Sequence, residues 1–268
     1  MIDRRSLLAV AGMAPLAACA PRPAAPRALL RLATFNIWHD AGDWAARLPL
    51  LVAALRAADA DVIGLQEVLQ DGRKRLPNQA ETIAAALGGY RVTFMSTSPP
   101  DAANRYGNAV LTRLPVLSAD TRKLAPLSDY RTAIRVRVAR AGTPVDIVVT
   151  HLAWQPDAAA VRAQQVRDLL AWLPADGTPL VVMGDFNAPL ADPGLAPLRQ
   201  RGLVPAPLPP SVRTTLVEAR GHAPRIIDHI LADPGRFAIG PAHRIGDVPT
   251  DGEYPSDHFG VAAALRLS

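Results

Sequence analysis

The chain is poor in cysteine, lysine and aromatic residues, and each shortage excludes something. Cys19 is the only cysteine among 268 residues, so no disulfide can form within the chain. Lys74 and Lys123 are the only lysines, so the net charge of +5 reflects an arginine-rich composition and is weak evidence for a polyanionic partner. Aromatic residues make up only 5% of the chain, which gives no sign of stacking platforms for single-stranded nucleic acid or of a membrane-inserting hairpin.

Residues 1–18 are typical of an export signal. Arg4–Arg5 precede an apolar stretch, Leu7–Ala18, that is too short to span a bilayer. The paired arginines resemble a twin-arginine signal, although Sec signals also carry basic residues at this point. Leu16–Cys19 resembles a bacterial lipobox, in which the cysteine is lipidated and becomes the mature N-terminus. The alternative is a plain signal peptide with an incidental cysteine.

We therefore expect a signal peptide over residues 1–18, a lipidated Cys19 that starts a tether over residues 19–28, and a folded domain over residues 29–268. The tether is rich in proline and alanine and shows no apolar periodicity, as expected of a linker. These features predict an exported bacterial lipoprotein that is anchored to a membrane and faces the periplasm or the cell exterior.

Strand-like and helix-like patterns alternate through the rest of the chain without a break in composition. Hydrophobic residues make up 49% and charged residues 20%, as in ordinary globular domains. Apolar spacing predicts helices over residues 44–58, 81–87 and 158–173. Strands are expected over residues 30–38, 61–68, 90–95, 108–112, 132–139, 145–151, 180–183, 226–231 and 259–267. The pattern predicts a single α/β domain with helices outside packed sheets.

Polar residues that do not suit a core occur where five of the expected strands end. Any one of them alone reads more simply as a hydrogen-bonded residue at a sheet edge. If the strands lie side by side, however, their ends bring these residues together at one edge, which is where active sites on rigid sheets are commonly found. The residues are Asn36, Gln66-Glu67, His151, Asp185 with Asn187, and Asp228 with His229.

Seven short segments, five of which contain these residues, occur in order along the chain. They are Ala33–Trp38 (ATFNIW), Val62–Val68 (VIGLQEV), Tyr106–Arg113 (YGNAVLTR), Val149–Leu152 (VTHL), Gly184–Asn187 (GDFN), Ile226–Leu231 (IIDHIL) and Ser256–His258 (SDH). In order and spacing they resemble the endonuclease/exonuclease/phosphatase superfamily, the DNase I-like group of metal-dependent phosphoesterases. The resemblance covers nearly the whole chain from Leu30 onwards. It implies a four-layer α/β/β/α sandwich, with two packed mixed sheets flanked by helices.

The resemblance also implies a hydrolase that uses Mg²⁺, with Mn²⁺ as an alternative ion. Glu67 would be the principal metal ligand, with Asn36 beside it and Asp257 completing or orienting the coordination. Carboxylate oxygen suits a hard dication that keeps several waters. The ion would polarise the phosphoryl group and position the substrate.

The remaining motif residues receive catalytic roles from the same resemblance. His258 would be the general base that deprotonates the attacking water, and Asp228 would orient its imidazole. His151 and Asn187 would donate hydrogen bonds to phosphate oxygens as negative charge accumulates. Asp185 would position the nucleophile or assist the leaving group.

Other polar residues carry weaker signals. Asn108 is a candidate substrate contact, or simply a turn residue after Gly107. Arg73 and Arg75 lie just past Glu67 and would grip a phosphate backbone or a lipid headgroup, or belong to a solvated basic loop. His229 is expected to pack. Three histidines match no motif position and are expected at the surface: His39, His222 and His243.

The predicted activity is hydrolysis of a phosphodiester or phosphomonoester by in-line attack of water. One alternative is an extracellular DNA or RNA endonuclease of the same superfamily. Another is a catalytically inactive binding module, which predicts the loss of a residue such as Glu67 or His258, and neither is lost. The fold cannot choose among a small phosphoester, a lipid headgroup and nucleic acid as the partner. We expect a monomer with one phosphoester substrate and a membrane anchor.

Overall fold

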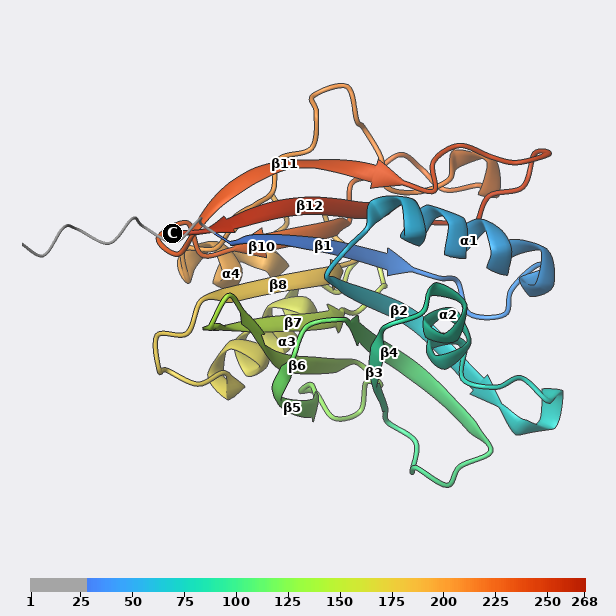
Figure 1. The fold of residues 1–268 in the computed structure, drawn as a ribbon, viewed down its shortest axis with the longest axis horizontal. Coiled ribbons are helices and arrows are strands. Elements are labelled where there is room, and N and C mark those ends of the chain that lie inside the picture. Colours follow the sequence, from blue (N-terminus) through green and yellow to red (C-terminus); the bar gives the residue numbers. More distant parts are fainter. Residues whose placement is uncertain (1–27) are drawn as a thin grey trace, which may run out of the picture.

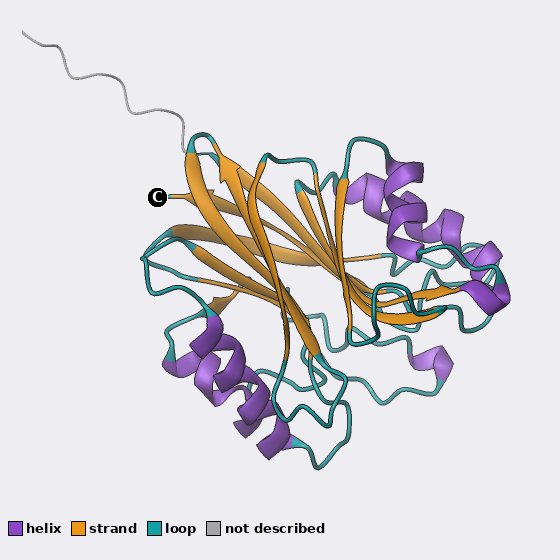
Figure 2. Ribbon diagram, turned by 90° about the horizontal axis from the view of Figure 1, so that it is seen from below, coloured by secondary structure: helices purple, strands orange, loops and turns teal. Residues whose placement is uncertain are grey.

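The computed structural model describes residues 28–268, so the predicted signal peptide, Cys19 and most of the tether lie outside the described residues. Two six-stranded sheets pack face to face, and helices cover their outer sides (Figures 1 and 2). The predicted four-layer α/β/β/α sandwich is confirmed. Within residues 28–268, no helix has both the length and the apolar character needed to cross a membrane.

The first sheet places β1 (Leu29–Asn36) and β2 (Val62–Asp71) at its centre, running parallel to each other, while all other neighbouring strands are antiparallel. Helices α1 (Trp44–Ala58) and α2 (Gln79–Leu87) cover its outer face, where Leu51 and Ile83 join the apolar cluster around Phe35. In spatial order its strands are β11 (Phe237–Ile245), β12 (Gly260–Leu267), β1 (Leu29–Asn36), β2 (Val62–Asp71), β4 (Asn104–Thr112) and β3 (Arg91–Ser96).

The second sheet repeats this plan, with β7 (Thr143–His151) and β8 (Leu180–Asp185) as its parallel pair. Helices α3 (Ala159–Trp172) and α4 (Ala196–Gln200) pack on its outer face through Val166, Leu169 and Leu198. Its strands, in spatial order, are β5 (Val116–Lys123), β6 (Thr132–Arg140), β7 (Thr143–His151), β8 (Leu180–Asp185), β10 (Asp228–Ala232) and β9 (Val204–Pro205). Short 3₁₀ turns occur at Gly72–Lys74, Pro193–Leu195 and Glu218–Arg220.

The core between the sheets is built from strand residues that alternate in direction. In β6, Val136 and Val138 are fully buried between the sheets, whereas Arg135 and Arg137 point outward and pair with Asp146 of β7. A side-chain period of two produces this division. The rigid double layer fixes the positions of the strand ends.

Three strands were not expected from the sequence: β5, β11 and the two-residue strand β9. Strand β5 (VLSADTRK) is an edge strand with partners on one side only, so few of its residues need to be apolar. Strand β11 contains Gly240-Pro241, and its register against β12 shifts between Ile239 and Ala242. Glycine and proline weaken the signal of a strand, and here they mark an irregularity within one.

Candidate active site

The topology brings the polar strand ends to one end of the sandwich. Asn36 of β1 lies beside Gln66 of the parallel strand β2, and His151 of β7 lies beside Asp185 of β8. Strands β10 and β12 run antiparallel to β8 and β1, so their starting ends reach the same place. Asp228, the first residue of β10, is therefore opposite Asp185, and His258 comes just before β12. The convergence expected from the sequence is present in the structure.

Glu67 enters the site through an irregularity of β2. The register with β4 shifts between Leu65 and Val68, which leaves one extra residue on β2. Glu67 sits in this bulge with a φ of 60°, a conformation that costs energy in a residue with a Cβ. The Asn36 amide donates to Oε1 of Glu67 at 3.2 Å and to Oδ2 of Asp185 at 3.0 Å. Asn36 thus connects the carboxylates of the two sheets.

His258 and Asp228 form a buried pair. The Nδ1 atom of His258 lies 3.0 Å from Oδ2 of Asp228, and Asp228 is fully buried. Since a carboxylate only accepts, Nδ1 carries the proton and Nε2 is the free nitrogen when the ring is neutral. Nε2 points toward the carboxylate of Asp185 at 3.8 Å and the amide of Asn36 at 3.5 Å. This is the geometry that a general base needs.

The site concentrates negative charge away from water. Burial alone would lower the pKa of His258, but the carboxylates of Asp228 and Asp185 outweigh it and raise that pKa to about 10. Burial, with a further contribution from Asp228, raises the pKa of Asp185 to about 6, and burial likewise raises the pKa of Glu67. A cation held among the carboxylates would lower all three of these raised pKa values.

His151 and Asn187 present hydrogen-bond donors to the cavity. Arg131 can only donate, and its Nη1 lies 3.0 Å from Nδ1 of His151, so Nε2 of His151 carries the proton. The Asn187 amide nitrogen lies 2.9 Å from that Nε2 and also donates to the carbonyl of Leu152 at 3.1 Å, which fixes the amide orientation. Two donors this close are best satisfied by one shared acceptor, such as a phosphate oxygen. Burial, reinforced by the charge of Arg131, holds the pKa of His151 well below its usual value.

A close approach of backbones shapes the turn that carries Asp185 and Asn187. Gly184 has a φ of 148°, and a Cβ there would come within 1.9 Å of the Thr150 carbonyl oxygen. Only glycine therefore lets β8 lie this near the end of β7. Asn187 follows with a φ of 52°, and its backbone nitrogen donates to Oδ1 of Asp185 at 2.8 Å.

Asp257 lies between the His258–Asp228 pair and a histidine from another loop. Its Oδ2 is 3.1 Å from Nε2 of His222, and Ser256 contacts its Oδ1 at 3.3 Å. His222 also packs near the His258 ring, with centroids 6.4 Å apart. His222 was expected at the surface; its side chain is partly exposed, and it also lines the cavity from the loop before β10. His229 packs as expected, against Phe186, and its Nε2 contacts the Ala188 carbonyl.

Among the described residues, one trio of metal-type ligands has its donor atoms within 4.8 Å of one another: Asp185, Asp228 and His258. Two of its members are already hydrogen-bonded to each other, as a catalytic relay would be. The predicted metal ligands Glu67 and Asp257 are outside this trio, although Glu67 shares the Asn36 amide with Asp185. The carboxylate-rich cavity thus suits a divalent cation. The His258–Asp228 pair lies next to the predicted ligands Glu67 and Asp257.

Arg47 of α1 fixes the two loops that flank the site. It is fully buried and lies within 5.4 Å of the ring centres of both Trp38 and Trp44. Its guanidinium donates to the backbone carbonyls of Ile37, Trp38, His39, Ala41 and Pro255. One side chain therefore joins the loop after Asn36 to the loop that carries Asp257.

The site residues surround a cavity of about 360 Å³. Its wall includes six residues to which the sequence assigned no role: His39, Tyr106, Tyr130, Arg131, Trp154 and His222. His39, expected at the surface, is a partly exposed part of this wall. A signal existed for Arg131, because it immediately precedes β6, and β6 starts where the antiparallel strand β7 ends at His151. Finding it required the strand pairing, which the motifs alone do not give.

Three predicted substrate contacts lie away from this cavity. Asn108 is buried and donates to both oxygens of Thr132, so it ties β4 to β6. Arg73 is exposed and pairs with Asp71 of its own loop, and Arg75 ends the same 3₁₀ turn. None of the three lines the cavity, so their contact with substrate stays a prediction.

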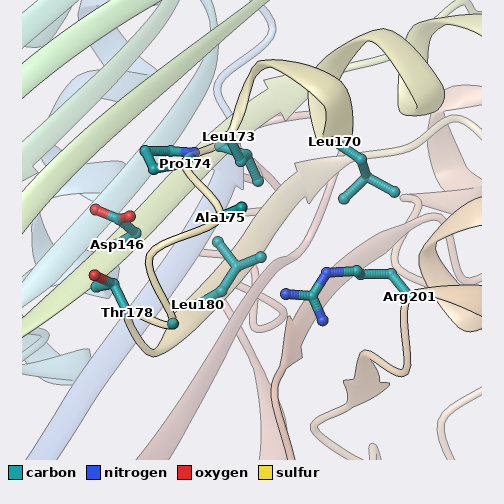
Figure 3. A pocket seen from close by; sticks show the side chains of 9 residues that line it. Asp146, Leu170, Leu173, Pro174, Ala175, Thr178, Leu180 and Arg201 are labelled. Carbon is teal, nitrogen blue, oxygen red and sulfur yellow. The ribbon is translucent and has the colours of Figure 1, made fainter.

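A cavity of about 320 Å³ lies at the opposite end of the second sheet (Figure 3). Leu170, Leu173 and Leu180 line its middle, with Asp146 and Arg201 on either side. Asp146 accepts two hydrogen bonds of 2.8 Å from Arg137 and is already neutralised. This cavity therefore offers a single carboxylate that is already paired, whereas Glu67, Asp185 and Asp257 all line the strand-end cavity.

Comparison with solved structures shows the same fold in proteins from several organisms. An endonuclease/exonuclease/phosphatase from Bacteroides vulgatus has a TM-score of 0.75 at 22% identity, covering 90% of this chain and 99% of that one. One from Beutenbergia cavernae has a TM-score of 0.70 at 25% identity, covering 90% and 72%. A mannosyl-6-phosphatase from Bacteroides thetaiotaomicron has a TM-score of 0.71 at 19% identity, covering 88% and 99%.

No curated protein matches the sequence at a significant level. The sequence does match the model of the Endonuclease/Exonuclease/phosphatase family over residues 33–258, which includes every strand that contributes to the cavity. The strand-end site lies at the residues through which the sequence resembles that family. The chain belongs to the endonuclease/exonuclease/phosphatase family of phosphoester hydrolases.

Proposed function

We propose that the protein is an exported phosphoesterase that requires a divalent metal and uses His258 as its general base. The observation that carries this proposal is the buried His258–Asp228 pair, whose free Nε2 faces the cavity where Glu67 and Asn36 meet. One structural neighbour is a mannosyl-6-phosphatase, which is consistent with phosphoester hydrolysis on this fold.

The chain's own residues divide the reaction between them. His258 takes a proton from water through Nε2, and Asp228 holds the ring and stabilises the imidazolium through Nδ1–H. His151 Nε2–H and the Asn187 amide donate to the phosphate oxygens as charge builds on them. Asp185, between His258 and His151, positions the water.

Mg²⁺ fits the donor set because the cavity is rich in buried carboxylate oxygen. Glu67, Asn36 and Asp257 would hold it, and it would polarise the phosphoryl group when bound. A dication among these carboxylates would also offset the fields that raise the pKa of His258 to about 10. His258 would then be neutral, as a base must be, at a lower pH.

The proposed lipid anchor constrains which substrates are reachable. Strand β1 begins beside the tether at Leu29 and delivers Asn36 to the site at its other end. Eight residues at about 3.3 Å each separate the two by roughly 25 Å. An anchored molecule would therefore carry its cavity on the side away from the tether, which favours a substrate in the surrounding medium over a headgroup of the anchoring membrane.

The test is hydrolysis by the full-length protein in detergent after chelation of its metals. We expect p-nitrophenyl phosphate or bis-p-nitrophenyl phosphate to be hydrolysed when Mg²⁺ is restored, with Mn²⁺ as the comparison, and not before. Phosphoester hydrolysis that persists unchanged after chelation would contradict metal dependence. No hydrolysis of either compound or of sphingomyelin or plasmid DNA would contradict the phosphoesterase itself.

A nuclease of the same family is the second candidate, favoured by the exposed Arg73 and Arg75 beyond β2. It predicts cleavage of plasmid DNA far above that of the small phosphoesters, falling steeply with salt as phosphate contacts are screened. Weak, salt-insensitive DNA cleavage would exclude it. The binding-module alternative is disfavoured because the catalytic residues are present and converge.

A further inference from the structure

A second cavity adjoins the active-site cavity and shares one wall with it. It has a volume of about 480 Å³ and lies between the loop before β6 and the loop between β7 and α3. Tyr130 lines both cavities, and Trp154 of the first is followed directly by Gln155 of the second. A substrate held by its phosphate beside His151 can therefore extend past Tyr130 into this second space.

The two cavities differ in charge. The phosphate side has Arg131, whereas no arginine or lysine lines the second cavity. Its polar wall consists of Ser128, Asp129, Gln155 and Asp157. The Asp129 carboxylate is held in place, because Oδ2 accepts from the Gln165 amide at 2.8 Å and Oδ1 accepts from the Tyr130 backbone nitrogen at 2.7 Å.

Aromatic side chains stand at the junction between the cavities. Tyr130 is 46% exposed and Trp154 is 57% exposed, which is high for large rings beside a buried site. The Arg131 guanidinium lies 4.7 Å from the Tyr130 ring centre and supports it from the phosphate side. Rings next to fixed acceptors suit a ligand with apolar C–H faces and several hydroxyl donors.

We propose that this second cavity binds a neutral, hydroxyl-rich leaving group, so that the substrate is a phosphomonoester of a sugar or polyol. The proposal rests on the phosphoesterase function given above. The oxygen of water forms the new bond to phosphorus, and the bond from phosphorus to the sugar oxygen breaks. The leaving oxygen takes up a proton, and the products are the free sugar and inorganic phosphate. A polynucleotide would instead place its next phosphate against Asp129 and Asp157, where like charges repel.

Turnover tests the subsite through selectivity. Glucose 6-phosphate, p-nitrophenyl phosphate, a nucleoside 5′-monophosphate and a dinucleotide are compared on the full-length protein with Mg²⁺. We expect Asp157→Arg to lower the ratio of kcat/KM for glucose 6-phosphate over p-nitrophenyl phosphate by about tenfold, mainly through KM. The same charge change at Asp101, an exposed loop residue outside both cavities, should leave the ratio unchanged.

Fluorescence of Trp154 measures binding independently of turnover, and Trp154→Phe is the control for the signal of the other tryptophans. Quenching by glucose 6-phosphate, but not by inorganic phosphate or the dinucleotide, supports the subsite. If such quenching is seen and no compound is hydrolysed, only the phosphoesterase proposal fails. If p-nitrophenyl phosphate is hydrolysed while Asp157→Arg leaves the ratio unchanged, the function stands and the sugar subsite is refuted. Preference for the dinucleotide, in which the phosphate is a diester, also refutes it.

Discussion

The Nδ1 atom of His258 lies 3.0 Å from Oδ2 of Asp228, while its Nε2 faces the opposite way, toward Asp185. One nitrogen is thus committed to an orienting carboxylate and the other is free for the reaction. Replacing His258 with alanine should lower kcat for p-nitrophenyl phosphate by about 10²- to 10⁴-fold, the usual contribution of a general base. Asp228→Asn should also reduce kcat, because the amide no longer fixes the tautomer or stabilises the cation.

The matched control for this prediction is His243→Ala, since His243 is exposed on β11. It should keep the parent kcat. Full activity of His258→Ala with Mg²⁺ present would remove His258 from the mechanism, whatever the cause of the pairing with Asp228.

Arg131 fixes the tautomer of His151 and supplies positive charge on the phosphate side of the cavity. Arg131→Ala should lower kcat/KM for p-nitrophenyl phosphate by about 10²-fold, the usual cost of losing an aimed donor at a developing charge. Arg131→Lys should recover part of the loss, because it keeps the charge but not the planar guanidinium. Arg91→Ala, at an exposed position of β3, is the control. Equal activity of all four proteins would show that Arg131 has no part in catalysis.

The position of Arg131 in the site is one that the sequence alone does not predict. Asn36 and Glu67 were predictable because each follows an apolar run, and Asp228 was predictable because it belongs to one of the motifs that occur in order along the chain. Parallel central pairs then placed these ends together in the structure. Arg131 belongs to a loop after the edge strand β5, whose few apolar residues gave no strand signal. Its position beside His151 depends on the pairing of β6 with β7, which a local pattern does not contain.

The same limit applies to the loops that close over the site. His222 reaches Asp257 across 35 positions of sequence, from a loop with no periodicity that would predict its path. Arg47 belongs to a helix and to none of the seven motif segments, yet its guanidinium is fully buried against backbone carbonyls. Contacts of this kind follow from tertiary packing, so the sequence predicted the catalytic strand ends better than their surroundings.

Arg47 provides a stability prediction. Its replacement by methionine would leave several buried carbonyls, including those of Ile37 and Pro255, without a donor. The free energy of unfolding should fall by about 3–5 kcal/mol, as when a buried charged partner is removed. Urea unfolding followed by circular dichroism measures this, with the exposed Arg91→Met as control. A loss close to that of the control would mean that water replaces the guanidinium without cost.

His229 predicts a pH dependence of stability. Burial lowers the pKa of its imidazole to about 4, from an ordinary value of 6.5. Between these values the unfolded chain binds a proton that the folded chain does not. Its contribution to stability is therefore complete above pH 6.5 and is lost as the pH falls toward 4. The full difference is on the order of 3 kcal/mol.

Removing the titrating ring should remove this dependence. In His229→Phe the ring still packs against Phe186, and the fall in unfolding free energy between pH 6.5 and 4 should be smaller than in the parent protein. His243→Phe changes an exposed histidine in the same way and should keep the parental slope. Identical slopes in both variants would show that His229 is protonated in the folded protein.

Membrane anchoring is tested at Cys19. Because no other cysteine exists in the chain, Cys19→Ser removes the single residue that can carry a thioether-linked lipid. The full-length variant should move from the membrane fraction to the soluble fraction of the cell envelope, since one or more acyl chains supply the attachment. Its activity on p-nitrophenyl phosphate should be retained, because the site lies at the far end of β1 from the tether. Membrane retention of Cys19→Ser equal to that of the parent would show that attachment does not depend on lipidation.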